Sequence, residues 1–275
     1  MKELGDMSVR QFIDISGVVA AGDFASGEQQ VIRPEYNKDT ADKSIEKRAV
    51  SDVDRYVQKK LLENIGRAFP KTCHVIAEED DDGIHDVLER YFLQTNVLSA
   101  DGYTLVIDPI DGTANYLAGA PGGKEKGKRN ENFWAVSLCL LHRGEIQMGV
   151  MCYPNLKTIL TTQKGAGTYI NGKKIILPPM KFEPDQPIRL GSGFEPKPRK
   201  SMNLVTTGSV CVTTLAILKQ GLHDERLRTV PDCHAYATSR SSYLTDLAAA
   251  PLAWQEAGGV ILDTAGDPAD IVKHI

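Results

Sequence analysis

Residues 104–113 constrain the fold of this chain most strongly, because a short apolar strand there runs directly into two acidic residues. Residues 104–107 predict a buried strand, Asp108 and Asp111 end it, and a Gly-Thr pair follows. A buried carboxylate is costly unless a cation or hydrogen bonds stabilise it, and two close together cost more. A divalent metal ion removes that cost, so this run predicts a metal site. An ordinary turn also uses Asp, Pro and Gly, and remains the alternative interpretation.

The composition excludes several classes of protein. The chain has 275 residues, of which 41% are hydrophobic and 25% charged, as expected of a globular protein with a large core. The net charge of −4 provides no basic excess to neutralise phosphates, so no nucleic-acid polymer is expected as a partner. We expect neither a membrane span nor a signal peptide, since no apolar run approaches about 18 residues.

The cysteines and histidines also narrow the possibilities. Five cysteines are scattered along the chain without a CxxC pair, which predicts reduced, mostly buried thiols and a cytoplasmic location. Six histidines are equally scattered, which argues against a zinc enzyme.

Hydrophobic spacing and turn residues predict alternating helices and strands. Helices are expected over residues 8–21, 51–68, 84–95, 209–220 and 246–257, and strands over 73–77, 104–107, 133–141, 145–153, 158–162, 167–170 and 260–263. Loops are expected at 28–48 and 119–131, and a Pro- and Lys-rich linker at 178–200. This order predicts a layered α/β or α+β sandwich with an N-terminal half, 1–180, and a C-terminal half, 181–275.

Three acidic features fall at the ends of predicted elements. Glu78 and Glu79 end one strand, Asp108 and Asp111 end another, and Asp246 begins a helix. Adjacent strand ends lie roughly 5 Å apart, so Glu78 and Asp108 can reach one ion. Four carboxylates and a backbone carbonyl suit two hard cations about 3.5–4 Å apart. Taken singly, the acidic run at 78–82 reads more simply as a solvated stretch, and Asp246 as a helix N-cap.

Gly112 and Thr113 follow the second strand acid. If a helix begins here, its free N–H groups face the site and can bind a phosphate. The Thr113 hydroxyl is then a candidate to orient a water molecule, and Asp54 a candidate to polarise it. By itself, Asp54 is only a negative charge in the first turn of a predicted helix.

These residues resemble the inositol monophosphatase family of lithium-sensitive, magnesium-dependent phosphatases, which includes the 3′(2′),5′-bisphosphate nucleotidases. The resemblance is specific at residues 108–113 and covers most of the chain from about residue 43 to 268. It is supported by Glu78-Glu79, by residues 50–54, by the hairpin at 165–173 and by Asp246 upstream of an Ala-Gly-Gly run.

The resemblance implies an αβαβα sandwich with two or three Mg2+ ions and a small phosphorylated substrate. It assigns the first Mg2+ to Glu78, Asp108 and the carbonyl of Ile110, the second to Asp108, Asp111 and Asp246, and a weaker third to Glu78 with Glu79 nearby. It further assigns water activation to Asp54 and Thr113, and the phosphate to the amides of Gly112 and Thr113. The rest of the substrate is expected at Lys43, Glu79, Ser209 and Arg240. The family often forms homodimers.

The chain departs from the family pattern in its C-terminal half. Thr245 stands where a Trp is common, and Ser239 stands where inositol-type enzymes often carry a Glu. Residues 150–156 look closer to the bisphosphate nucleotidase branch. We therefore expect a Mg2+-dependent phosphomonoesterase acting on an inositol monophosphate-like metabolite. The alternatives are 3′-phosphoadenosine 5′-phosphate or a sugar phosphate as substrate, and a non-catalytic phosphate-binding protein on the same fold.

Overall fold

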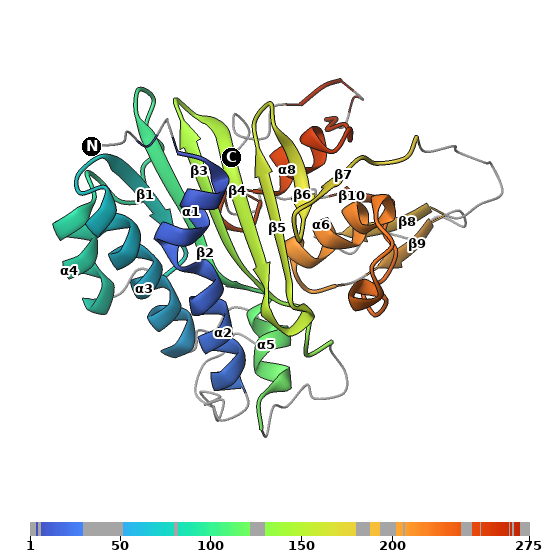
Figure 1. Ribbon diagram of the computed structural model, residues 1–275, viewed down its shortest axis with the longest axis horizontal. Helices are drawn as coiled ribbons and strands as arrows, with labels where there is room; N and C mark the ends of the chain where they lie inside the picture. The colour runs from blue at the N-terminus through green and yellow to red at the C-terminus, as the bar shows by residue number, and fades with distance from the viewer. Residues whose placement is uncertain are drawn as a thin grey trace.

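The structure is a computed structural model built on two β-sheets with helices between and beside them (Figure 1). It describes residues 4, 7–29, 52–79, 82–121, 130–179, 188–192, 202–205, 207–237, 244–247, 249–263, 265 and 267–269. For a few of these, including Asp246, only the backbone is described. None of the helices within these ranges combines the length and apolar character needed to cross a bilayer.

The larger sheet has seven strands in the order of the chain. They are β1 (Cys73–Ala77), β2 (Tyr103–Asp111), β3 (Ala135–His142), β4 (Glu145–Tyr153), β5 (Thr158–Gln163), β6 (Gly167–Ile170) and β7 (Lys173–Ile175). β1 and β2 are parallel, and every later pair is antiparallel. Five of these strands fall on predicted strands with small shifts at their ends. β2 continues to Asp111, beyond the predicted end at 107, and β7 was not predicted.

The smaller sheet is parallel, with strand order β10-β8-β9. Its strands are β8 (Ile188–Ser192), β9 (Met202–Val205) and β10 (Ala235–Ala237). The prediction of a structureless linker over 178–200 was therefore wrong for β8. Short strands among many Pro and Lys residues give little hydrophobic signal, and their pairing depends on partners distant in the chain.

The first predicted helix, residues 8–21, is two helices, α1 (Val9–Ser16) and α2 (Val18–Gln29). Gly17 lies between them with a φ of 68°, and its N–H donates to the carbonyl of Ile13. This left-handed cap favours glycine and ends α1. The prediction of one helix was wrong because the apolar spacing continues across the cap.

The next two helices differ in how well the sequence predicted their ends. α3 (Asp52–Ala68) matches its prediction, whereas α4 (Asp82–Tyr91) ends before residue 95. The chain after α4 runs along β1, where the N–H of Leu93 donates to the carbonyl of Cys73 and that of Asn96 to Val75. The helix ends early because the hydrogen bonds to the backbone groups of β1, an edge strand, stabilise the fold more than another helical turn would.

The remaining helices are α5 (Thr113–Gly119), α6 (Val210–Leu218), α7 (Leu244–Leu247) and α8 (Ala250–Glu256). The predicted helix over 246–257 is thus divided between α7 and α8, and Pro251 lies in the first turn of α8, where its missing N–H does no harm. The strand predicted at 260–263 is not formed; a single bridge joins Leu262 to Pro268. Most of the loops predicted at 28–48 and 119–131 lies outside the described residues.

Alternate residues of the larger sheet pack into two different cores. Leu105 and Ile107 of β2 face α1, α2, α3 and α4, whereas Val106 faces α6 and α8. In Figure 1 α6 lies between the larger sheet and the strands β8 and β9. Helix, sheet, helix and sheet therefore follow one another, as the predicted layered sandwich requires. β2 is covered on both faces, which explains its apolar run at residues 105–107.

Two helical glycines provide a test of the packing between α3 and α4. A Cβ at Gly66 of α3 would overlap the side chain of Tyr91 in α4, whereas a Cβ at Gly27 of α2 would meet nothing. We expect Gly66→Ala to lower the free energy of unfolding by about 1–3 kcal/mol through overpacking. Gly27→Ala should leave it unchanged or raise it by up to about 1 kcal/mol, because alanine favours helix. Urea unfolding measures both, and equal effects would contradict this packing.

Candidate active site

Glu78 and Asp108 lie directly beyond the last residue pair of the parallel strands β1 and β2. Ala77 of β1 pairs with Ile107 of β2, so the next residue on each strand is one of these acids. Their side chains form a hydrogen bond, which requires one of the two carboxyl groups to carry a proton. The adjacency that the sequence predicted for these two carboxyl groups is therefore present.

A β-bulge brings Asp111 to the same face of the sheet as Asp108. Asp108 pairs with Ser137 of β3 and Asp111 with Ala135, so β2 has one extra residue between these pairs. In a regular strand, residues three apart point to opposite faces. The inserted residue lets Asp108 and Asp111 point to the same face of the sheet. Both acids lie near Cys211 of α6.

The carboxylate of Asp111 is bound by the N-terminus of α6. Its Oδ2 accepts from the hydroxyl of Ser209 at 2.5 Å and from the N–H of Cys211 at 2.6 Å, and its Oδ1 accepts from the N–H of Val210 at 3.2 Å. Ser209 is also the N-cap of α6, since its Oγ accepts from the N–H of Val212 at 3.0 Å. One serine therefore connects the acid of β2 to the start of a helix 98 residues later in the chain.

Neighbouring buried groups also hold the turn after β2 close to the N-terminus of α6. The side-chain amide of Asn115 donates to the carbonyls of Phe133 and Thr207, both at 2.7 Å. Gly112 has a φ of 93°, and a Cβ there would lie 3.0 Å from the Cβ of Ser209. Glycine at this position thus allows the close approach of the β2 turn to α6.

Burial dominates the electrostatics of the cluster. The pKa of Glu78 is raised, chiefly because its carboxyl group is withdrawn from water; the bond with Asp108 opposes this rise and the charge of Asp111 adds to it. Over the whole residue, however, Glu78 is exposed, unlike Asp108 and Asp111, which are buried. Burial also raises the pKa of Asp111, against its bonds from Ser209, Cys211 and Val210. Asp108 is 2% exposed.

Thr113 opens α5 directly after this cluster. Its hydroxyl donates to the carbonyl of Ile110 at 2.9 Å, which joins the predicted water-activating side chain to a predicted metal ligand. The carbonyl of Gly112 accepts from the N–H groups of Asn115 and Tyr116. A helix therefore begins here.

Asp54 and Glu79 are buried on the side of α3. Asp54 is 1% exposed, and its charge contributes to raising the pKa of Tyr116, which burial raises most. The backbone of Glu79 is bonded at both its N–H and its carbonyl by the side chain of Gln58, also in α3. Sequence reasoning did not single out Gln58, because a glutamine in an amphipathic helix has no distinguishing spacing.

The position of Asp246, the third acidic feature, is given by the packing of its helix, α7. α7, which contains Asp246, packs against β1, β2 and α6, the elements next to the other acids. The side chain of Asp246 lies outside the described part of the structure, as do Lys43, Ser239 and Arg240. Thr245, at the position where the family commonly has Trp, is buried.

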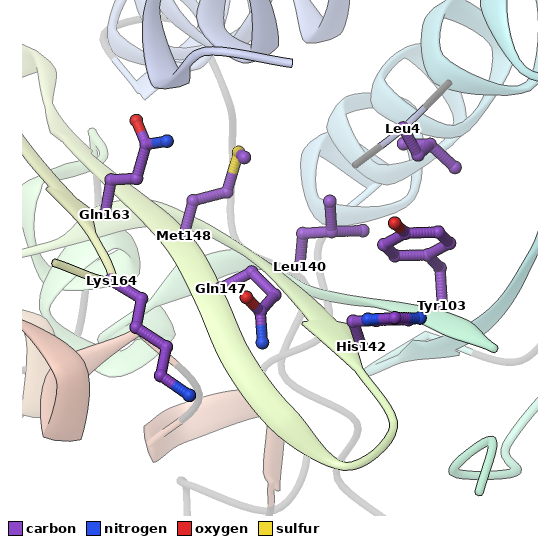
Figure 2. Close-up of a pocket in the computed structure, with 8 residues that line it drawn as sticks. All are labelled: Leu4, Tyr103, Leu140, His142, Gln147, Met148, Gln163 and Lys164. Atoms are coloured by element: carbon purple, nitrogen blue, oxygen red, sulfur yellow. The ribbon is translucent and has the colours of Figure 1, made fainter. Parts of the chain in front are cut away.

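A cavity of about 170 Å3 lies at the other end of the sheet (Figure 2). Tyr103 and His142 line it with their rings stacked 4.3 Å apart, and Lys164, also in its wall, pairs with Glu145 at 2.6 Å. Tyr103 begins β2 and Asp111 ends it. This cavity is therefore separate from the carboxylate cluster.

A profile of the inositol monophosphatase family matches residues 13–274. The chain belongs to this family. The family predicted from residues 108–113 is thus confirmed, and with it the predicted enzyme class, since the members are phosphoric monoester hydrolases. Members act on small phosphorylated substrates and are generally metal-dependent.

Individual relatives agree with this assignment. Inositol monophosphatase 1 of Sus scrofa is 26% identical over 233 residues, which cover 82% of this chain and 74% of that protein. Nus factor SuhB of Xylella fastidiosa is 26% identical over 225 residues, covering 80% and 70%. The solved structure of the Thermotoga maritima IMPase has a TM-score of 0.67 at 22% identity, over 95% of this chain and 88% of that one. This likeness confirms the predicted fold.

The donor atoms of the cluster fit a hard divalent cation. Glu78, Asp108 and Asp111 supply carboxylate oxygens and Ile110 a carbonyl, which are the ligands that Mg2+ prefers. Oδ2 of Asp111 already accepts two donors, whereas Oδ1 accepts the one longer bond, so Oδ1 has room for a further partner. Among the described side chains, no group of three or more acidic, imidazole or thiol residues is arranged closely enough to hold a metal ion by itself. Asp246, whose side chain is outside that set, is the predicted additional ligand.

Replacing the serine between Asp111 and α6 tests this junction. Ser209→Ala removes both a helix cap and a hydrogen bond to a buried carboxylate. We expect it to lower the free energy of unfolding by about 2–4 kcal/mol. Ser8→Ala is the matched control, because Ser8 caps α1 through Gln11 far along the chain from Asp111. It should lose only about 1 kcal/mol. Denaturant unfolding compares the two, and equal losses would show that the bond to Asp111 does not contribute.

Proposed function

We propose that this protein is a Mg2+-dependent phosphomonoesterase that hydrolyses a small phosphorylated metabolite of the inositol monophosphate type. One observation carries the proposal: the carboxyl groups of Glu78, Asp108 and Asp111 are gathered where β1 and β2 end. Such a gathering of acids destabilises the fold unless a cation or protons neutralise it. Membership of a metal-dependent phosphatase family supports the same conclusion.

Bound Mg2+ would stabilise negative charge on the phosphoryl oxygens and lower the pKa of a coordinated water. In this proposal Glu78, Asp108 and the Ile110 carbonyl hold the first ion. Asp108, Asp111 and Asp246 hold the second, and Glu78 a weaker third with Glu79 beside it.

Thr113 and Asp54 orient and deprotonate the attacking water. The Thr113 hydroxyl donates a hydrogen bond to the carbonyl of Ile110, so its oxygen lone pairs can accept a hydrogen bond from that water. Asp54, a buried carboxylate in the first turn of α3, then takes the proton as general base. The amides of Gly112 and Thr113 receive the phosphate, and Lys43, Ser209 and Arg240 are proposed to contact the remainder of the substrate.

Asp108→Asn tests the role of the cluster. The variant removes a charged ligand shared by both proposed ions. We expect kcat to fall by at least about a hundredfold, since several kcal/mol of stabilisation are lost and each 1.4 kcal/mol is about tenfold. The variant should remain folded, because a buried charge is replaced by an amide of the same shape. Asp101→Asn is the control: Asp101 is exposed and precedes the other end of β2. Near wild-type phosphate release from Asp108→Asn would refute this mechanism.

Inhibition by lithium provides a second test. We expect Li+ to displace one Mg2+ from the oxygen ligands and to slow hydrolysis, while K+ at equal ionic strength leaves the rate unchanged. Phosphate release is measured with inositol monophosphate, 3′-phosphoadenosine 5′-phosphate and a sugar phosphate, so the same assay ranks the substrates. The resemblance of residues 150–156 to the nucleotidase branch makes the nucleotide the principal alternative. Rates indifferent to lithium would count against the metal chemistry.

A further inference from the structure

The backbone immediately after β1 is bound by a side chain instead of by a strand. The ladder between β1 and β2 ends at Ala77, and the extended segment on the other edge of β1 bridges to Val75. Residue 79 therefore lies beyond both ladders. Its N–H donates to Oε1 of Gln58 at 2.9 Å, and its carbonyl accepts from Nε2 of Gln58 at 2.6 Å.

This pair of bonds reproduces the two bonds that one residue exchanges with a neighbouring strand. Gln58 is fully buried and Glu79 is 9% exposed, so water cannot readily replace either of the two hydrogen bonds. Leaving both backbone groups unsatisfied would cost a few kcal/mol. The amide of Gln58 thus fixes the end of β1 at the point where the chain turns away from the sheet.

The location of Gln58 links two parts of the candidate site. Asp54 and Gln58 are four residues apart in α3, on the same face of the helix. Glu78, whose carboxyl group bonds to Asp108, is the residue directly before the clamped backbone. The two bonds from Gln58 to the Glu79 backbone, here called the clamp, therefore set the separation between Asp54, the proposed general base on α3, and Glu78 at the end of β1.

We propose that Gln58 is a positioning residue, which holds Glu78 against Asp108 and in register with Asp54 for cation binding. The inference rests on the proposed function for the identity of the cation. It requires no direct contact between Gln58 and substrate or metal. Residues that act through a ligand in this way typically change metal affinity by about 10–100-fold when they are replaced.

Three variants test the proposal. Gln58→Leu removes both bonds, and Gln58→Glu keeps the shape and the acceptor for the Glu79 N–H but loses the donor. Asn64→Leu is the matched control, because Asn64 in the same helix also donates to a backbone carbonyl, that of Ser16, at 3.1 Å. Mg2+ affinity is measured by calorimetry, hydrogen exchange at the Glu79 amide by NMR, and kcat and KM by phosphate release.

We expect Gln58→Leu to weaken Mg2+ binding by about tenfold or more and to speed exchange at Glu79. Gln58→Glu should weaken Mg2+ binding while the amide stays protected, because only the carbonyl loses its partner. Asn64→Leu should lower thermal stability with Mg2+ affinity unchanged. Mg2+ affinity that is equal in wild type and both Gln58 variants would overturn the positioning role alone. A wild-type protein that neither binds Mg2+ nor releases phosphate would instead overturn the proposed function and this inference with it.

Discussion

Three carboxyl groups that approach one another at the end of a buried strand pair are the constraint on which this structure depends. Glu78, Asp108 and Asp111 are held in place by backbone geometry, whereas their charges repel and their burial disfavours ionisation. Hydrogen-bond donors in the surrounding structure, above all those at the N-terminus of α6, stabilise the Asp111 carboxylate. A helix N-terminus carries partial positive charge and unpaired N–H groups, so it is suited to a buried carboxylate.

Three separate structural features bring these carboxyl groups together. Parallel pairing of β1 with β2 places Glu78 beside Asp108. The bulge after Asp108 turns Asp111 to the same face of the sheet. Helices on both faces then complete the site, with α3 contributing Asp54 from one core and α6 binding Asp111 from the other. The acids therefore lie where both cores meet the end of the sheet, an arrangement that a single layer of helices would not provide.

The adjacency of Glu78 and Asp108 was predictable from local sequence, while several elements of the fold were not. The segment that ends in Asp-Pro-Ile-Asp-Gly-Thr contains the strand, a proline within the stretch where the bulge occurs, and the glycine that adopts positive φ. The cap at Gly17, the early end of α4 and the small parallel sheet were missed. Each depends on hydrogen bonds to residues far along the chain or on a cap inside a continuous apolar pattern. All the predicted metal, catalytic and substrate roles remain predictions, and Lys43, Arg240 and the Asp246 side chain also lie outside the described structure.

The sequence by itself determined the chemistry available: which acids end which strands, where glycine permits a tight turn, and which family the chain belongs to. Only the tertiary structure decided how those groups are held. The bond from Ser209 to Asp111 spans 98 residues, and the clamp of Gln58 on Glu79 joins a helix to the backbone beyond a strand end. Neither has a local signature, because serine and glutamine satisfy distant polar groups through packing and not through any spacing along the chain.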